Sequence, residues 1–165
     1  MFVSIPSKYN LKNIERISPH LKDIKHFLFY GTLLGYKRHN NVIEGDDDID
    51  ILVEISHKHE LIQLLLKLGY EISINEKYFV QATSQIDGII TYSDFYLYED
   101  TPYKDHIIDR WSLEGIVSDC TKHLHIPKNL IYPLKKGRMQ GIEVSLPSKV
   151  SDICEFIYGK NYNVP

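Results

Sequence analysis

The residues best suited to chemistry lie in one acidic segment, residues 46–50, where four of the five positions are aspartate. An apolar run follows at residues 51–53, so we expect a β-strand that begins at the acids and enters the core. Because side chains alternate along a strand, Asp46, Asp48 and Asp50 would share one face, with Asp47 pointing away. Two carboxylates about 5 Å apart repel by roughly 3 kcal/mol at an effective dielectric constant of ~20, and a hard divalent cation relieves that repulsion.

A solvated acidic loop is the alternative, since most charge runs in proteins are solvated. The sequence upstream favours the strand, because an apolar stretch ends abruptly at Gly31 and Thr32. A strand, a small-residue turn that opens a helix and a returning strand with Asp-x-Asp together suit a phosphate and its metal ion. We expect Gly31 and Thr32 to offer backbone N–H groups and the positive end of a helix dipole to that phosphate.

Asp94 is the second acidic signal, because it lies in the middle of a segment rich in β-branched and aromatic residues, 88–98. An isolated buried carboxylate costs several kcal/mol, so Asp94 needs a basic partner, a metal ion or solvent. One interpretation places it on the wet face of an antiparallel strand. The other makes it a third carboxylate that faces Asp48 and Asp50 from a neighbouring strand, with oxygens of all three within about 5 Å.

Arg38 follows the turn at the expected end of the short helix 32–38. Its charge either compensates the helix dipole or clamps a phosphate of the substrate. Both interpretations stay open from the sequence.

The elements that position these residues alternate between helical and extended patterns. A broken amphipathic helix over residues 10–24 precedes the first strand, and a second amphipathic helix ends at Gly69. Residues 99–128 are polar and have no sustained period, so we expect a long irregular excursion that covers the acceptor site. The expected strands are 26–30, 43–55, 71–73, 77–83, 88–98 and a hairpin in 134–146, with a last helix after Ser148.

Composition narrows the class of protein. A length of 165 residues with 43% hydrophobic content fits one domain, residues 1–165. The net charge of −3 and the absence of a basic run interleaved with aromatics argue against nucleic-acid binding. No apolar stretch is long enough for a transmembrane segment, and the two cysteines form no paired motif, so we expect a soluble cytoplasmic protein.

The motifs resemble those of the LicD-type phosphotransferases, a family that is similar to the catalytic domains of fukutin-related proteins. The resemblance is carried by residues 30–35 (Tyr-Gly-Thr-Leu-Leu-Gly), by Arg38 with His39, by residues 46–50 and by the closing segment 131–165. One departure is at Glu44 and Gly45, where the family usually carries Pro-Trp.

The resemblance implies an α+β fold of the polymerase β-like nucleotidyltransferase kind, with a mixed central sheet flanked by helices. It implies transfer of phosphocholine or an alditol phosphate from a CDP-linked donor to a glycan hydroxyl, dependent on Mg²⁺ with Mn²⁺ as a substitute. Asp48, Asp50 and Asp94 would be the catalytic metal ligands, and Gly31, Thr32 and Arg38 would bind the donor. Two alternatives stay open, a minimal nucleotidyltransferase and a non-catalytic binding module of the same fold.

Overall fold

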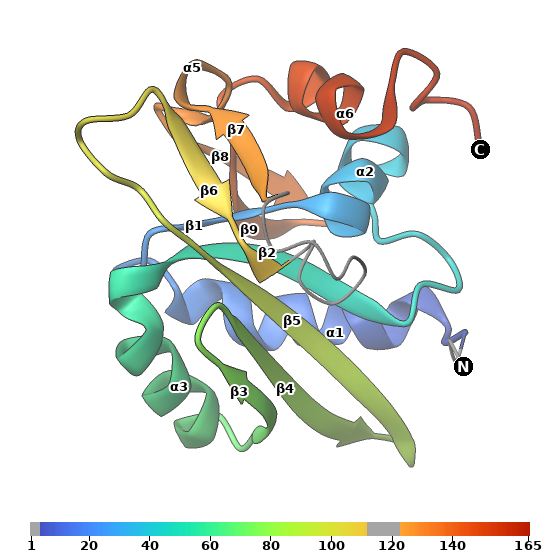
Figure 1. Cartoon of the computed structure of the whole chain (residues 1–165). Coiled ribbons are helices and arrows are strands. Elements are labelled where there is room, and N and C mark those ends of the chain that lie inside the picture. The colour runs from blue at the N-terminus through green and yellow to red at the C-terminus, as the bar shows by residue number, and fades with distance from the viewer. Residues whose placement is uncertain (1–3, 112–122) are drawn as a thin grey trace.

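The protein is built on a mixed five-stranded sheet with helices packed against it (Figure 1). The computed structural model of the chain describes residues 4–111 and 123–165. In chain order the elements are α1 (Ser7–Ile17), η1 (Ser18–His20), β1 (His26–Leu28), α2 (Tyr30–His39), β2 (Asp48–Glu54), η2 (Ile55–His57), α3 (Lys58–Lys67), β3 (Glu71–Glu76), β4 (Phe79–Ile86), β5 (Ile89–Tyr98), β6 (His106–Asp109), β7 (Leu124–Pro127), α5 (Lys128–Ile131), β8 (Lys135–Met139), β9 (Ile142–Leu146) and α6 (Val150–Tyr158).

The strand order in the large sheet is β1-β2-β5-β4-β3. β2 and β5 are parallel neighbours, and the remaining pairs are antiparallel. The chain passes from β2 to β5 through α3 and the β3–β4 hairpin, a connection long enough for a parallel pair. The expected α+β class, with a mixed sheet flanked by helices, is therefore confirmed.

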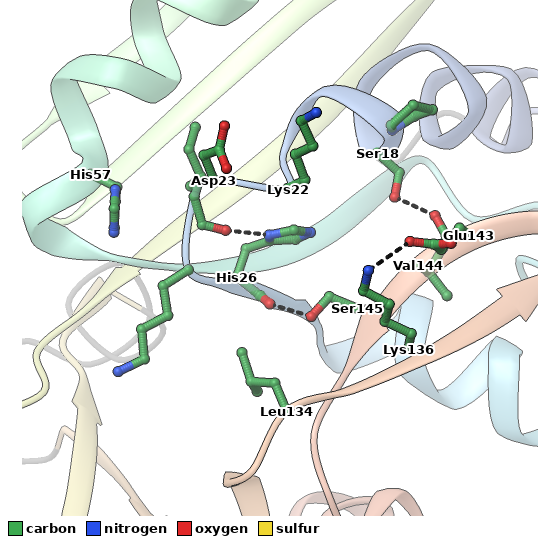
Figure 2. Close-up of a pocket in the computed structure, with 13 residues that line it drawn as sticks. Ser18, Lys22, Asp23, His26, His57, Leu134, Lys136, Glu143, Val144 and Ser145 are labelled. Carbon is green, nitrogen blue, oxygen red and sulfur yellow. Dashed lines mark hydrogen bonds and ion pairs between the residues drawn. The ribbon is translucent and has the colours of Figure 1, made fainter.

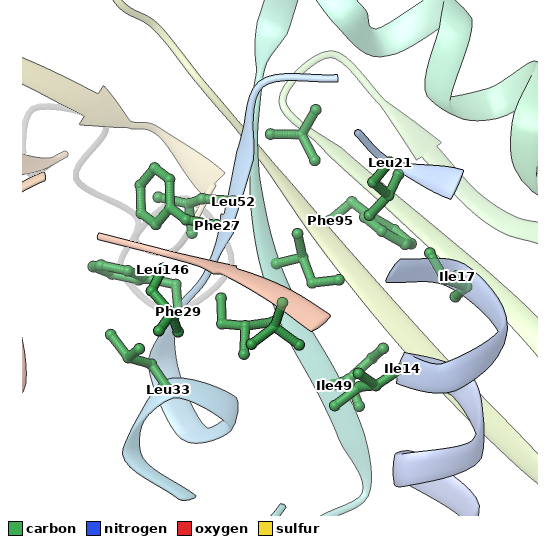
Figure 3. Packing of buried hydrophobic residues seen from close by; sticks show 14 of the residues in the cluster. Ile14, Ile17, Leu21, Phe27, Phe29, Leu33, Ile49, Leu52, Phe95 and Leu146 are labelled. Atoms are coloured by element: carbon green, nitrogen blue, oxygen red, sulfur yellow. The ribbon is translucent and has the colours of Figure 1, made fainter. Parts of the chain in front are cut away.

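One part of the core lies where α1 packs against one face of the central strands (Figure 3). Ile14 and Ile17 of α1 and Ile49 and Phe95 of the sheet are all fully buried. Ile49 and Phe95 alternate along their strands with Asp50 and with the acid of β5, so the apolar residues face α1 and the acids face the other way.

On the other side of the sheet, α2 and α6 lie against each other. The β8–β9 hairpin lies beside the edge strand β1 and also contacts η1. α2 begins directly after β1 and ends at Asn40, which has the left-handed conformation (φ 52°) common at helix ends. None of the helices in the described ranges is long and apolar enough to cross a membrane.

The predicted irregular excursion over residues 99–128 is wrong at both of its ends. β6 and β7 pair as a short antiparallel ribbon, with Ile107 and Ile126 fully buried. Four-residue strands hold only two inward positions each, too few to give a period along the sequence. The middle of the predicted acceptor cover, residues 112–122, lies outside the described residues.

Candidate active site

Three carboxylates converge at the point where β2 begins. The parallel register places Asp50 directly beside Asp94, and Asp48 lies two residues earlier on the same face of β2. Side-chain oxygens of Asp48, Asp50 and Asp94 all lie within 4.8 Å of one another. We call these three residues the acid triad. The structure thus brings together the acids that the sequence proposed, and the wet-face interpretation of Asp94 fails because this residue is only 7% exposed.

Burial and mutual repulsion make the acid triad unfavourable in its fully ionised form. Burial raises the pKa of Asp48 and Asp50 well above the usual range, and the neighbouring carboxylates raise both further. Burial also raises the pKa of Asp94, although a hydrogen bond from Gln81 (2.9 Å) opposes that effect. An all-oxygen, triply acidic donor set of this size fits a hard divalent cation such as Mg²⁺ or Mn²⁺.

The turn between β1 and α2 is tied to the acid triad by its backbone and by one buried hydroxyl. The Gly31 N–H donates to the Asp50 carboxylate, and the Asp50 N–H donates to Thr32 Oγ1 at 2.8 Å. A Cβ on Gly31 would lie 3.0 Å from Asp46 Oδ2, so a larger residue there would have to displace the Asp46 carboxylate. Gly31 and Thr32 thus lie at the acids as expected, while their binding of a donor phosphate stays a prediction.

Asp46 lies outside β2, in the loop that leads into it, and stays close to the turn. Burial raises its pKa, and the Asp47 charge raises it further. Its backbone carbonyl accepts a hydrogen bond from Asn10 of α1 at 2.9 Å. Asp46 is therefore a fourth acid at the edge of the acid triad, held in place by α1.

Tyr30 and Asp109 are residues of this site that the sequence interpretation missed. Tyr30 has a positive φ of 44° at the start of α2, and its hydroxyl donates to the fully buried Asp109 of β6. A positive φ is uncommon for a tyrosine and marks a constrained turn. The available signal was an acid that ends an apolar run, Ile107-Ile108-Asp109, whereas Asp94 had been identified by its place in the middle of an apolar segment.

An aromatic wall, formed by Tyr30, Phe79, Tyr96 and Trp111, adjoins the acid triad. The Tyr96 ring contacts those of Tyr30 and Phe79, with centroids 4.9 and 5.2 Å apart, and Phe79 stacks on Trp111 at 4.7 Å. The Tyr96 hydroxyl donates to Asp50 at 3.1 Å, which joins the wall to the acids.

Arg38 lies at the end of α2 and contacts the C-terminal segment. Its guanidinium donates to the backbone carbonyls of Tyr162 at 2.6 Å and Val164 at 2.9 Å. Tyr158 at the end of α6 lies near the acids, since burial and then the Asp50 charge raise its pKa. The proposed phosphate clamp by Arg38 stays a prediction, and the structure gives this side chain a second, structural task.

With this geometry in place, comparison with known proteins identifies the family. Residues 23–149 match the family model described as LicD/FKTN/FKRP, nucleotidyltransferase domain, and the chain belongs to this family. An uncharacterized protein of Rickettsia typhi is 30% identical over 128 residues, and one of Rickettsia prowazekii is 27% identical over 131 residues. Each match covers 76% of this chain but only 37% and 44% of the two relatives, so the chain spans less than half of their length.

Solved structures confirm the nucleotidyltransferase fold. The lincosamide antibiotic adenylyltransferase LnuA, bound to lincomycin, superimposes with a TM-score of 0.56 at 15% identity, over 97% of this chain and 90% of that one. The antibiotic-resistance factor ANT(2'')-Ia superimposes with a TM-score of 0.57 at 14% identity, over 96% and 75% of the two chains. At these identities the likeness establishes the fold alone.

Proposed function

We propose that this domain transfers a phosphorylated small alcohol, phosphocholine or an alditol phosphate, from a CDP-linked donor to a hydroxyl of a glycan. The observation that carries the proposal is the convergence of three buried carboxylates within 4.8 Å, beside the turn that opens α2, in a LicD-family domain. Phosphoryl transfer depends mainly on positioning and on neutralising charge at the phosphate oxygens, and an acid triad of this kind can hold the cation that does so.

Each residue of the site has a separate task in this proposal. Asp48 and Asp50 hold the divalent cation, which supplies positive charge at the donor diphosphate. The Gly31–Thr32 turn positions that diphosphate at the start of α2. Asp94 accepts the proton of the attacking glycan hydroxyl as the general base. The Gln81 amide fixes the orientation of the Asp94 carboxylate.

Thermal unfolding with candidate donors tests the proposal. We expect CDP-choline, CDP-ribitol or CDP-glycerol with Mg²⁺ to raise the melting temperature, because a ligand at a hundred times its Kd adds about 2.7 kcal/mol to the free energy of unfolding. UTP and ATP serve as controls. Stabilisation by ATP or UTP alone would contradict the CDP-linked donor.

Turnover provides the second test. Release of CMP from the stabilising donor should fall by at least a hundredfold in Asp50→Asn, because the exchange removes a metal ligand at the reaction centre. Asp87→Asn, in the exposed β4–β5 turn, is the matched control and should retain full activity. No CMP release above background by the native protein would support the binding-module interpretation, and equal release by Asp50→Asn would contradict the acid triad as the reaction centre.

A nucleotidyltransferase is the second candidate, favoured by the fold of LnuA and ANT(2'')-Ia. The same acid triad and turn would then direct a nucleoside monophosphate to the acceptor. Product analysis separates the two reactions. A nucleotide attached to the acceptor indicates nucleotidyl transfer, whereas free CMP and a phosphoalcohol on the acceptor indicate the LicD-type reaction.

A further inference from the structure

A cavity of about 590 Å³ lies where η1 and the start of β1 meet the β8–β9 hairpin (Figure 2). His26 in its wall pairs with Val53, and because side chains alternate along β2, the His26 ring is on the face that carries Ile49 and not on the face that carries Asp50. The cavity is therefore separate from the acid triad. Its volume is within the range of small-molecule sites.

His26 presents a fixed hydrogen-bond acceptor to this cavity. The side chain is only 7% exposed, and Nδ1 lies 2.6 Å from the Ile24 carbonyl oxygen. Because a carbonyl only accepts, Nδ1 carries the proton and Nε2 keeps a free lone pair. Figure 2 shows Nε2 pointing away from that carbonyl into the cavity, and none of the described residues bonds to it. The Ser145 hydroxyl donates to the His26 carbonyl at 2.7 Å and fixes the backbone.

Three lysines line this cavity. Among the described side chains Lys22 has no ion partner, although it lines the cavity. Lys136 is 3.3 Å from Glu143, but both side chains are more than half exposed, so this ion pair is weak. A ligand anion can therefore replace Glu143 as the partner of Lys136. Lys25 is bound elsewhere, 2.9 Å from Asp100 and over the Tyr132 ring. Two lysines are therefore available to a ligand.

The rest of the cavity wall combines apolar surface with a carboxylate that can accept a hydrogen bond from a hydroxyl group. Pro19, Leu134 and Val144 supply carbon surface, and Asp23 adds a carboxylate that has no ion partner in the described chain. Apolar walls with a few convergent polar groups are typical of sites for small organic ligands. Inorganic phosphate alone would use the lysines but neither the carbon surface nor the His26 acceptor.

We propose that this cavity binds a small hydroxylated anion, a sugar or polyol that carries a phosphate or a carboxylate. One hydroxyl donates to His26 Nε2, the anionic group lies between Lys22 and Lys136, and the carbon skeleton contacts Pro19 and Leu134. The same chemistry is offered by a free metabolite and by one unit of an anionic polymer. The site is independent of the proposed transfer reaction, because it lies on the opposite face of the sheet.

Nitrogen-15 NMR of labelled histidine side chains tests this site directly. The full chain is titrated in EDTA, so that the acid triad holds no metal, with glycerol 3-phosphate as the probe and with glycerol or inorganic phosphate as comparisons. We expect a saturable shift of the His26 Nε2 resonance with glycerol 3-phosphate and a much smaller one with either comparison. An Nε2–H tautomer in the free protein, or no shift at His26, would overturn the proposal.

Charge variants give a second, independent measurement. Lys22 is exposed, so Lys22→Gln should leave the fold intact while it weakens glycerol 3-phosphate binding at least tenfold. Lys67→Gln, on α3 and outside the cavity, is the matched control. Equal affinities of the two variants would overturn the assignment of Lys22.

The source of the ligand is tested by comparing glycerol 3-phosphate with a short poly(glycerol phosphate). A polymer that binds more than tenfold tighter than the monomer indicates a polymeric ligand. Equal affinity per glycerol phosphate unit indicates a free metabolite.

Discussion

Proton binding by the acid triad links the charge of the candidate site to the stability of the protein. The ordinary pKa of an aspartate is 3.8, and burial with neighbouring charge raises that of Asp50 to about 8. Between these values the folded protein binds more protons than the unfolded chain, so the free energy of unfolding falls as pH rises. We expect the metal-free protein to lose stability from pH 6 to pH 8, measured by urea unfolding, and excess Mg²⁺ to abolish this loss.

Neutralising one acid should remove part of this pH dependence. Asp48→Asn should make the metal-free protein more stable at pH 8 by about 1 to 3 kcal/mol, because burial and the neighbouring carboxylates raise the pKa of Asp48 to about 10 and an amide needs no proton to be buried there. The same variant should lose stabilisation by Mg²⁺. Asp87→Asn, exposed and away from the site, should change neither quantity. If the free energy of unfolding of the metal-free protein rose from pH 6 to pH 8, this result would contradict the mutual repulsion of the acids.

Thr32 should contribute to stability through one buried hydrogen bond. Its Oγ1 accepts from the Asp50 N–H at 2.8 Å, and the residue is 1% exposed. Thr32→Val keeps the shape but leaves a buried N–H unsatisfied, so we expect a loss of about 1 to 3 kcal/mol in urea unfolding. Thr32→Ser retains the hydroxyl and is the control. A larger loss in the serine variant would show that packing of the methyl group matters more than the bond.

For single residues, alternation along one strand was enough to predict which acids share a face. Asp48 and Asp50 lie together because of their spacing alone, and the isolated charge of Asp94 demanded a partner. Tyr30 and Asp109 are 79 residues apart, and their contact depends on the position of β6 over the sheet. No local pattern contains that information, so these two residues were found only from the structure.

Among the elements, α2 depends on a glycine that a helix would not otherwise favour. A Cβ on Gly35 would lie 2.5 Å from the Asn41 carbonyl oxygen and 3.0 Å from the Ile43 nitrogen, where the chain returns toward β2. Alanine is the better helix former by about 1 kcal/mol, yet backbone atoms cannot move aside as a flexible side chain would. We expect Gly35→Ala to lower the free energy of unfolding by about 1 to 3 kcal/mol.

Lys37→Ala provides the comparison for this prediction, since Lys37 is exposed on the same helix. It should change the free energy of unfolding by less than about 0.5 kcal/mol. If Gly35→Ala were as stable as Lys37→Ala, the loop after α2 would have to move easily. The metal site would then not depend on close packing between α2 and that loop.

Strong periodicity explains which elements the sequence predicted. The β3–β4 hairpin, β5 and the β8–β9 hairpin follow from alternating apolar residues, and the end of α3 follows from Gly69, which has φ 89°. The predicted strand 43–55 begins too early, because β2 starts only at Asp48. The acids that precede it form a loop, in which the Asp46 N–H donates to the Ile43 carbonyl and the Asp46 carbonyl accepts from Asn10.

For the whole molecule, the arrangement of distant segments decides what surrounds the acids. α6 and the residues after it lie beside α2, although more than a hundred residues separate Arg38 from its acceptors Tyr162 and Val164. The cavity at His26 likewise combines η1 with the β8–β9 hairpin. Such contacts depend on the order of strands in the sheet, which the family resemblance indicated and the local sequence did not.

Arg38 is the residue at which the sequence and the structure suggest different tasks. If the two hydrogen bonds to the C-terminal segment are its main contribution, Arg38→Met should accelerate proteolytic cleavage within residues 159–165 several-fold. Stabilisation by Mg²⁺ and by the CDP-linked donor should then remain. Lys37→Met, which removes the neighbouring charge but no contact to this segment, is the matched control. If Arg38 clamps a donor phosphate instead, the donor will no longer stabilise Arg38→Met, and the cleavage rate of the C-terminal segment will equal that of the control.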